Sequence, residues 1–115
     1  MTVKILHNPR CSKSRATLAL LQDRGIEPEI QLYLESPPDE SELKAILKKL
    51  GMKPGELIRR GEAEFKQLGL ADARLDDAKL ISAMVSHPKL IERPIVLANG
   101  KAAIGRPPES VLDIL

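Results

Sequence analysis

An abrupt change of pattern at Asn8-Pro9 constrains this chain more than any other sequence feature. Residues 3–6 before it form a short apolar run that is typical of a strand, and the residues after it follow helical spacing. Pro9 favours an extended Asn8 and starts a turn, while Gly25 is placed where a helix would end. The start of the chain therefore predicts a strand, a turn and a helix that begins near Cys11.

A second strand is expected directly after this helix. Ile30, Leu32 and Leu34 alternate with Gln31 and Tyr33. Such alternation predicts a strand whose isoleucine and leucines form the buried face. Together with the first strand and the helix, this segment predicts a βαβ unit with parallel strands and a right-handed crossover.

The middle of the chain, residues 39–90, is predicted to be a helical insertion. Asp39 followed by Glu42 is typical of a capped helix start, and Gly51 is placed as its end. Shorter helices are expected from Pro54 to Arg60, from Glu62 to Leu68 and from about Asp76 to Val85.

The C-terminal part carries the strongest local signal, the dipeptide Asn99-Gly100. Two short apolar runs, at 95–98 and 101–104, flank it. Both residues of the dipeptide tolerate positive φ, so the pattern predicts a β-hairpin with a two-residue turn. A last helix, with Val111, Leu112 and Leu115 on one side, is expected to follow.

The order of these elements predicts the fold class. A βαβ unit, a block of helices and a ββα unit are typical of an α/β fold with a mixed four-stranded sheet. This is the thioredoxin-like arrangement, with the helical insertion between the βαβ and ββα parts. We expect one domain over residues 1–115, with the insertion at about 39–90.

Composition excludes several classes of function. The 115 residues, 43% of them apolar, suffice for one core, and the net charge of +2 is spread over both signs along the chain. This spread argues against nucleic acid as a partner. The sequence holds no apolar run of signal-peptide or membrane-spanning length, so we expect a cytoplasmic protein with no membrane partner.

Cys11 is the only cysteine, so it can form neither an intramolecular disulfide nor a two-sulfur metal site. If a helix begins beside it, the sulfur faces unpaired N–H groups and the positive end of the helix dipole, which lower the pKa of the thiol. Arg10, Lys13 and Arg15 add positive charge, and the polar neighbours Arg10, Ser12, Lys13 and Ser14 favour partial exposure. An inert buried thiol is the alternative, and the local chemistry favours a reactive one.

Two residues near Cys11 exclude familiar kinds of thiol chemistry. Ser14 stands where a Cys-x-x-Cys redox pair would place its second cysteine, so a disulfide at Cys11 needs a thiol from outside. Thr17 stands where a Cys-x5-Arg phosphatase loop would place its arginine. An oxyanion would therefore need arginines from elsewhere in the chain. The candidates are Arg59 or Arg60, Arg93 before Pro94, where a cis bond is possible, and Arg106.

Several spaced motifs together resemble the glutaredoxin-coupled arsenate reductase family. The motifs span essentially the whole chain: His7 to Arg15, Tyr33 to Pro38, Leu57-Ile58-Arg59, Leu68-Gly69-Leu70, His87-Pro88, Glu92 to Val96 and Gly105-Arg106-Pro107. The resemblance implies a thioredoxin-like fold with a helical insertion, no metal and a single catalytic cysteine. Acidic residues without an accompanying His or Cys likewise give no reason to expect a metal site.

The resemblance also implies roles for individual residues. Cys11 would be the nucleophile that attacks arsenate, and the family's three oxyanion-binding arginines would correspond to Arg59, Arg93 and Arg106. The spacing to the Leu68-Gly69-Leu70 motif favours Arg59 over Arg60. The residues expected to support the thiolate are His7, Asn8 and Ser14.

In that family, glutathione is a co-substrate that joins the cysteine-bound arsenate, and glutaredoxin supplies the reducing thiol as arsenite leaves. No bound cofactor is expected. Two other functions stay open from the sequence. One is a thiol-dependent oxidoreductase for another substrate, such as a glutathionylated protein. The other is a regulatory module that binds RNA polymerase, which shares the fold. Ser14 counts against the second, because those regulators resemble Cys-x-x-Cys proteins.

Overall fold

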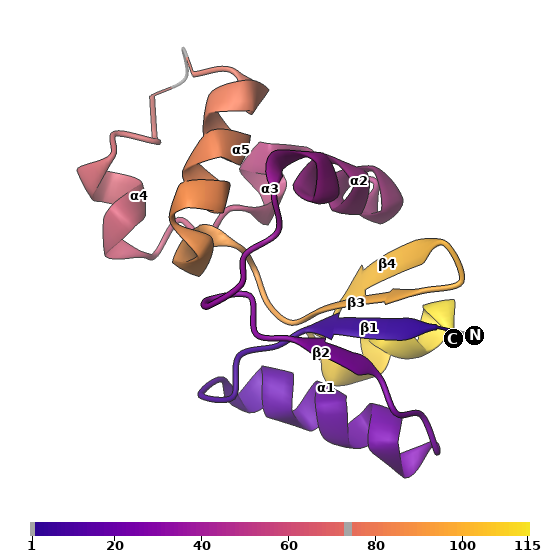
Figure 1. Cartoon of the computed structure of the whole chain (residues 1–115). Helices are drawn as coiled ribbons and strands as arrows, with labels where there is room; N and C mark the ends of the chain where they lie inside the picture. The colour runs from indigo at the N-terminus through magenta and orange to yellow at the C-terminus, as the bar shows by residue number, and fades with distance from the viewer. Residues whose placement is uncertain (1, 73–74) are drawn as a thin grey trace. The chain divides into compact units, whose positions relative to one another are not determined.

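A mixed four-stranded sheet joins the two ends of the chain (Figure 1). The structure, a computed structural model, describes residues 2–72 and 75–115. The strand order is β2-β1-β3-β4, with β1 parallel to β2 and the other pairs antiparallel. The strands are β1 (Val3–Leu6), β2 (Glu29–Gln31), β3 (Ile95–Ala98) and β4 (Lys101–Ile104). The predicted α/β fold with a mixed sheet is confirmed.

One face of this sheet is covered by the helix α1 (Ser12–Asp23) and by the 3₁₀ helix η2 (Pro108–Ile114). Pairing between the strands places alternate apolar residues of β1 and β3 on this face. The resulting core consists of Val3, Ile5, Leu21, Val96, Ala98, Val111 and Ile114. The last helix is thus where the sequence predicted it, and its turns are of the tighter 3₁₀ kind that is common in short segments.

The hairpin between β3 and β4 forms as predicted. Asn99 and Gly100 have φ values of 55° and 73°, which is the left-handed backbone that a two-residue hairpin turn requires. Asn99 also donates a hydrogen bond from Nδ2 to the carbonyl oxygen of Ile114, at 2.9 Å. The turn is therefore tied to the end of η2.

The prediction for the second strand is wrong in one respect. Ile30, Leu32 and Leu34 are exposed, whereas Tyr33 is only 1% exposed. The strand β2 lies at the edge of the sheet and ends at Gln31, and the carbonyl of Leu32 then accepts the turn bonds of the following segment. The alternation of apolar and polar residues runs on to Leu34, although the strand ends at Gln31. In this segment, alternation therefore does not identify the buried face of a strand.

The chain divides into two units. The first consists of Met1–Ser36 and Arg93–Leu115, and the second of Pro37–Glu92. The second unit closely matches the helical insertion predicted at about 39–90. The assignment of all 115 residues to one domain stays a prediction.

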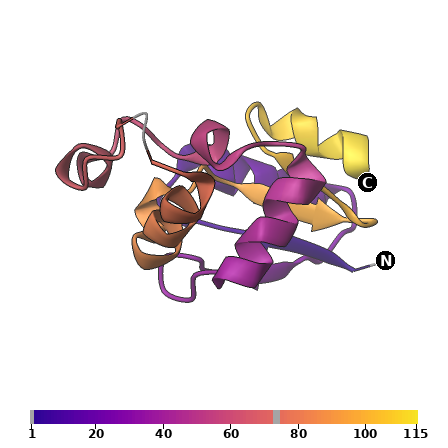
Figure 2. The same cartoon turned by 90° about the horizontal axis from the view of Figure 1, so that it is seen from above.

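Helices make up most of the second unit. In this unit α5 packs against α2, α3 and η1 (Figure 2). The helices are α2 (Glu40–Leu50), α3 (Pro54–Leu57), α4 (Ala63–Gln67), α5 (Asp77–Ser86) and the 3₁₀ helix η1 (Pro88–Leu90). The predicted caps are present: Asp39 Oδ1 accepts the N–H of Glu42 at 2.8 Å, and Asp76 Oδ1 accepts that of Lys79 at 2.9 Å.

The helix that starts at Pro54 is shorter than predicted. It ends at Leu57, because the next residue, Ile58, leaves the helix and forms an isolated antiparallel bridge with Ile91. Among the residues that the structure describes, no helix has the length and apolar character needed to cross a membrane.

Candidate active site

Cys11 occupies the N-cap position of α1, with an extended backbone. Pro9 ends the extended segment after β1, and the N–H of Cys11 closes a turn by donating to the carbonyl of Asn8 at 3.0 Å. The carbonyl of Cys11 then accepts the N–H of Arg15 at 3.0 Å, which is the first bond of the helix. The sulfur therefore lies at the start of the helix, as the sequence predicted.

The expected partial exposure of Cys11 is not found. Its neighbours Arg10, Ser12 and Lys13 are exposed, but Cys11 itself is only 8% exposed. Residues distant in sequence account for the difference, because Arg106 Nη2 lies 3.8 Å from the sulfur and donates to it. Polar sequence neighbours are therefore compatible with a buried thiol.

The environment lowers the pKa of the Cys11 thiol overall. Burial raises this pKa, because it disfavours the charged thiolate. The backbone N–H groups of Ser14 and Lys13 and the guanidinium of Arg93, through its charge and a hydrogen bond, outweigh burial and lower the pKa. Both backbone groups belong to the first turn of α1, so the start of the helix acts directly on the sulfur. A thiolate is thus favoured at a nearly buried position.

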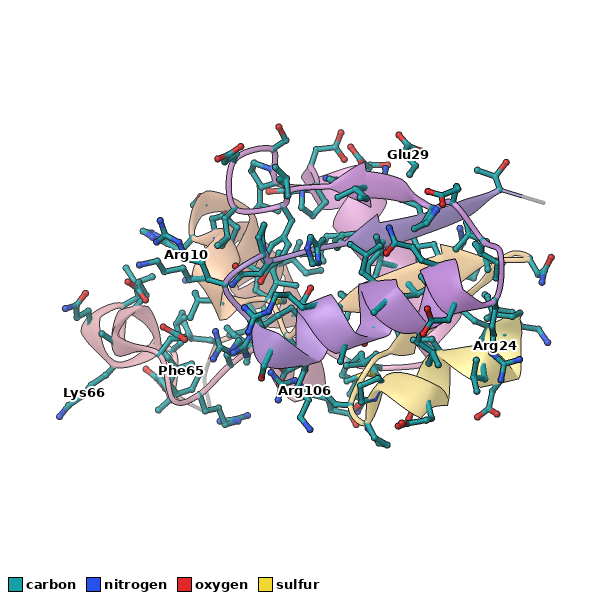
Figure 3. The ribbon with its side chains drawn as sticks, turned by 90° about the horizontal axis from the view of Figure 1, so that it is seen from below. Arg10, Arg24, Glu29, Phe65, Lys66 and Arg106 are labelled. Carbon is teal, nitrogen blue, oxygen red and sulfur yellow. The ribbon has the colours of Figure 1, made fainter. Side chains whose placement is uncertain are left out.

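The hairpin brings Arg93 and Arg106 together. Ile95 of β3 pairs with Ile104 of β4, so the residues just outside the two strands also face one another. Accordingly, Arg106 Nε donates to the carbonyl of Arg93 at 2.9 Å, and Figure 3 shows Arg106 beside the first turns of α1. The bond between Arg93 and Pro94 is cis, which the sequence had suggested as possible. Two arginines that are far from Cys11 in sequence therefore lie beside its sulfur.

His7, Asn8 and Ser14 form a hydrogen-bonded group behind the turn. Ser14 Oγ accepts the backbone N–H of Asn8 at 3.0 Å and lies 2.6 Å from His7 Nδ1. Asn8 Oδ1 accepts the N–H of Arg10 at 3.0 Å, which closes the turn further. Both His7 and Ser14 are buried. The three supporting residues predicted from the sequence therefore lie in one network, which holds the start of α1.

The His7 ring favours its neutral form. Burial, and then the charge of Arg15, lower the pKa of His7 below its ordinary value of 6.5. Because Ser14 Oγ already accepts the N–H of Asn8, its hydroxyl proton suits an accepting Nδ1 on a neutral ring. From the sequence, Arg15 was expected only to add positive charge near Cys11. In the structure, its Nη1 also donates to the carbonyl of Pro9 at 2.9 Å, a contact that sequence spacing alone does not reveal.

The remaining candidate arginines belong to the second unit and are engaged there. Arg59 Nη1 lies 2.6 Å from Glu62 Oε1, and its Nε lies 3.9 Å from Glu92 Oε1. Arg60 lies over the ring of Phe65, 5.3 Å from its centroid. The role assigned to Arg59 by resemblance stays a prediction.

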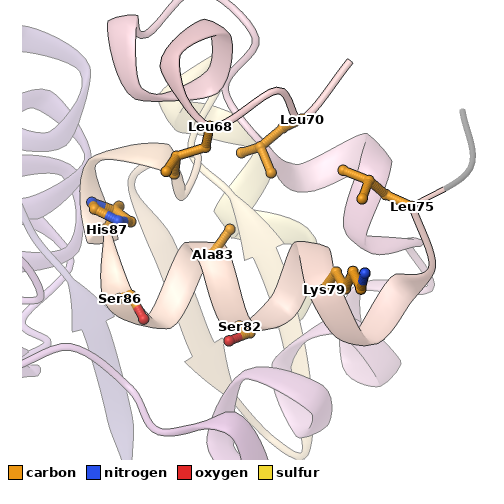
Figure 4. Close-up of a pocket in the computed structure, with 8 residues that line it drawn as sticks. All are labelled: Leu68, Leu70, Leu75, Lys79, Ser82, Ala83, Ser86 and His87. Atoms are coloured by element: carbon orange, nitrogen blue, oxygen red, sulfur yellow. The ribbon is translucent and has the colours of Figure 1, made fainter. Parts of the chain in front are cut away.

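A pocket of about 290 Å³ also lies in the second unit (Figure 4). Half of its lining residues are apolar, and the others are two serines and two basic residues. The lining residues are Leu68, Leu70, Leu75, Lys79, Ser82, Ala83, Ser86 and His87. Within residues 2–72 and 75–115, no group of three or more His, Cys, Asp or Glu side chains could hold a metal ion.

Comparisons with known proteins identify the family of this chain. The model of the ArsC family matches residues 6–114. The chain is 60% identical to the uncharacterized protein YfgD of Escherichia coli strain K12, over 98% of this chain and 96% of that protein. It is 54% identical to an arsenate reductase of Neisseria meningitidis, over 98% of this chain and 97% of the relative.

Solved structures give the same result. An arsenate reductase from Vibrio cholerae superposes with a TM-score of 0.98 at 52% identity, covering 100% of this chain and 98% of the other. A putative arsenate reductase from Yersinia pestis gives a TM-score of 0.94 at 54% identity, covering 97% and 99%. These matches confirm the predicted fold class. The chain, with its one cysteine at the start of α1 beside two arginines, belongs to the ArsC family.

Proposed function

We propose that this protein reduces arsenate to arsenite, with Cys11 as the nucleophile. The observation that carries the proposal is the position of the Cys11 sulfur. It lies at the start of α1, beside the guanidinium groups of Arg93 and Arg106. A thiolate is the reactive form of cysteine, and guanidinium groups bind tetrahedral oxyanions well. The names of relatives at 50–54% identity support arsenate as the substrate.

External thiols complete the proposed reaction. The Cys11 sulfur attacks arsenic, and an oxygen leaves as water. The sulfur of glutathione then bonds to the cysteine-bound arsenic while a second oxygen leaves as water, and a thiolate of glutaredoxin attacks the glutathione sulfur. This attack forms a disulfide between glutaredoxin and glutathione and leaves the electron pair of the broken As–S bond on arsenic, so that As(V) becomes As(III). Water then breaks the remaining bond between arsenic and Cys11 and releases arsenite and the Cys11 thiol. A chain with one cysteine requires such an outside reductant, because it has no second thiol of its own.

The other predicted residues act on binding and on the state of the sulfur. Arg93 and Arg106 hold the oxyanion and offset the charge that collects when thiolate and arsenate meet. His7 and Ser14, with the backbone of Asn8, keep the start of α1 in place. Arg59 is the third oxyanion-binding residue of the proposal, assigned from its motif.

A coupled assay tests the proposal. The protein is mixed with arsenate, glutathione, glutaredoxin, glutathione reductase and NADPH, and arsenate-dependent loss of NADPH is recorded. We expect turnover that requires both glutathione and glutaredoxin. The variant Cys11→Ser should reduce it by roughly a thousandfold or more, because the hydroxyl is a far weaker nucleophile at neutral pH.

Matched outcomes separate the alternatives. Arsenate turnover that survives in Cys11→Ser would rule out the proposed nucleophile. Absence of arsenate turnover, together with rapid deglutathionylation of a glutathionylated protein, would identify a thiol oxidoreductase for another substrate instead.

A further inference from the structure

Gly105 sits at a crowded point between α1 and the start of β3. Its backbone φ is outside the left-handed region, so its backbone conformation does not require glycine. The lack of space around Gly105 does require it: a Cβ at this position would overlap Thr17 Oγ1 and lie 2.8 Å from Pro94 Cγ. A Cβ atom essentially never lies this close to a non-bonded heavy atom, so any side chain here would push the surrounding elements apart.

The two neighbours of Gly105 cannot easily move away. Thr17 is fully buried, and its Oγ1 donates to the carbonyl of Lys13 at 2.8 Å, which fixes the side-chain rotamer. Pro94 is also buried, and its carbonyl accepts the N–H of Gly105 at 3.0 Å. Gly105 is therefore held against the strand on one side and against the helix on the other.

The residues next to this junction are the two arginines at the sulfur. Arg93 directly precedes Pro94, and Arg106 directly follows Gly105. Arg106 Nε donates to the carbonyl of Arg93 at 2.9 Å, while its Nη2 reaches Cys11 Sγ at 3.8 Å. Cys11 caps α1 and Thr17 lies in its second turn, so the helix connects the crowded junction at Gly105 to the sulfur.

We propose that Thr17 and Gly105 are positioning residues, whose close packing with Pro94 sets the places of the Arg93 and Arg106 guanidinium groups beside Cys11. This role also gives a reason for threonine at the position where a Cys-x5-Arg loop would carry arginine. The side chain at position 17 points into the junction, so an oxyanion-binding group there would be misplaced. The inference concerns the sulfur's surroundings and holds whatever the substrate is.

The test is the pH profile of Cys11 alkylation by iodoacetamide, which reports the thiolate fraction without any substrate. In Gly105→Ala, the shifted arginines stabilise the thiolate less, so alkylation at pH 7 should slow by roughly three- to tenfold and the midpoint of the profile should rise. Gly61→Ala is the matched control: Gly61 has ordinary φ and open space around its Cβ position, so its profile should equal that of the parent.

A compensating change distinguishes the junction from a general packing defect. Thr17→Ala in the Gly105→Ala background removes the nearer clash and should restore part of the lost alkylation rate. A destabilised Gly105→Ala protein with the parent's alkylation profile would overturn the proposal, since it would show a purely structural role.

If Gly105→Ala does not fold, variants of Thr17 on the other side of the junction test the proposal. Thr17→Ala alone leaves the junction loose and should slow alkylation by roughly two- to threefold, whereas Thr17→Ser keeps the Oγ atom and its hydrogen bond to Lys13 and should slow it less. Identical profiles for the parent and both Thr17 variants would contradict the proposal.

Discussion

The two units of the chain use their charged groups in opposite ways. In the first unit, Arg93 and Arg106 face a single sulfur at the start of α1. In the second unit, Arg59 pairs with the carboxylates of Glu62 and Glu92, and no thiol is present. Positive charge beside a thiolate changes reactivity, whereas positive charge beside a carboxylate forms an ordinary ion pair. The comparison predicts that equal changes of charge will have unequal effects in the two units.

The largest expected effect follows removal of charge at the sulfur. Arg93→Gln should slow Cys11 alkylation at pH 7 by roughly three- to tenfold, because an opposite charge close to a thiol favours its ionised form. Arg106→Gln should slow it less. Arg24→Gln, at the far end of α1, removes the same charge and should have no effect. Equal rates in all three variants would show that the arginines do not act on the sulfur.

Within the first unit, the hairpin turn should affect stability and leave reactivity unchanged. Asn99→Ala introduces a side chain that disfavours the observed φ of 55° and removes the hydrogen bond to Ile114. We expect a loss of about 1–2 kcal/mol in the free energy of unfolding, measured by urea denaturation. Asn99→Gly keeps the backbone freedom and should lose less. If Asn99→Gly lost more stability than Asn99→Ala, the positive φ of the turn would not explain the loss.

A smaller effect is expected from His7, as a dependence of stability on pH. Its pKa is below the ordinary 6.5 in the folded protein, so the unfolded chain binds the proton more readily. The neutral ring therefore contributes stability that is fully present above pH 6.5 and is lost as the pH falls below it.

Denaturation at several pH values checks this sign. The loss of stability between about pH 7.5 and 5.5 should be smaller in His7→Gln than in the parent. His87→Gln, which changes the other histidine of the sequence, is the matched variant for comparison. A steeper loss in His7→Gln would contradict the assignment of a neutral buried ring.

The smallest effect is expected in the second unit. Glu62→Gln removes the partner of Arg59, where the two side chains are 26% and 24% exposed. A pair this exposed is screened by solvent, so the free energy of unfolding should fall by at most about 1 kcal/mol, and less at high salt. Cys11 alkylation should not change. If Glu62→Gln changed the alkylation rate as much as Arg93→Gln does, charge in the two units would not differ in its effect on Cys11.

The sequence was sufficient for the elements that rest on local chemistry. Asn99-Gly100 predicts the hairpin because few residues tolerate positive φ, and Asp39 predicts a helix start because its side chain caps free N–H groups. The position of Cys11 at the start of a helix follows from the same kind of signal at Asn8-Pro9.

Features that depend on tertiary neighbours were harder to predict. The burial of Cys11 was missed because the residues over it come from the hairpin, far along the chain. The exposure of Ile30 was missed because alternation in a sequence does not show that a strand lies at an edge. The contact between Arg93 and Arg106 could have been predicted from the sequence. Both residues lie equally far from the Asn99-Gly100 turn, so the hairpin places them opposite one another.

The most direct test of the account is the pH profile of Cys11 alkylation in the unchanged protein. The start of α1 and the charge of Arg93 together lower the pKa of the thiol despite its burial. The account therefore predicts a midpoint clearly below that of an ordinary cysteine, about 8.5, and rapid alkylation at neutral pH. A midpoint at or above the ordinary value would mean that burial prevails, and would contradict a thiolate nucleophile at Cys11.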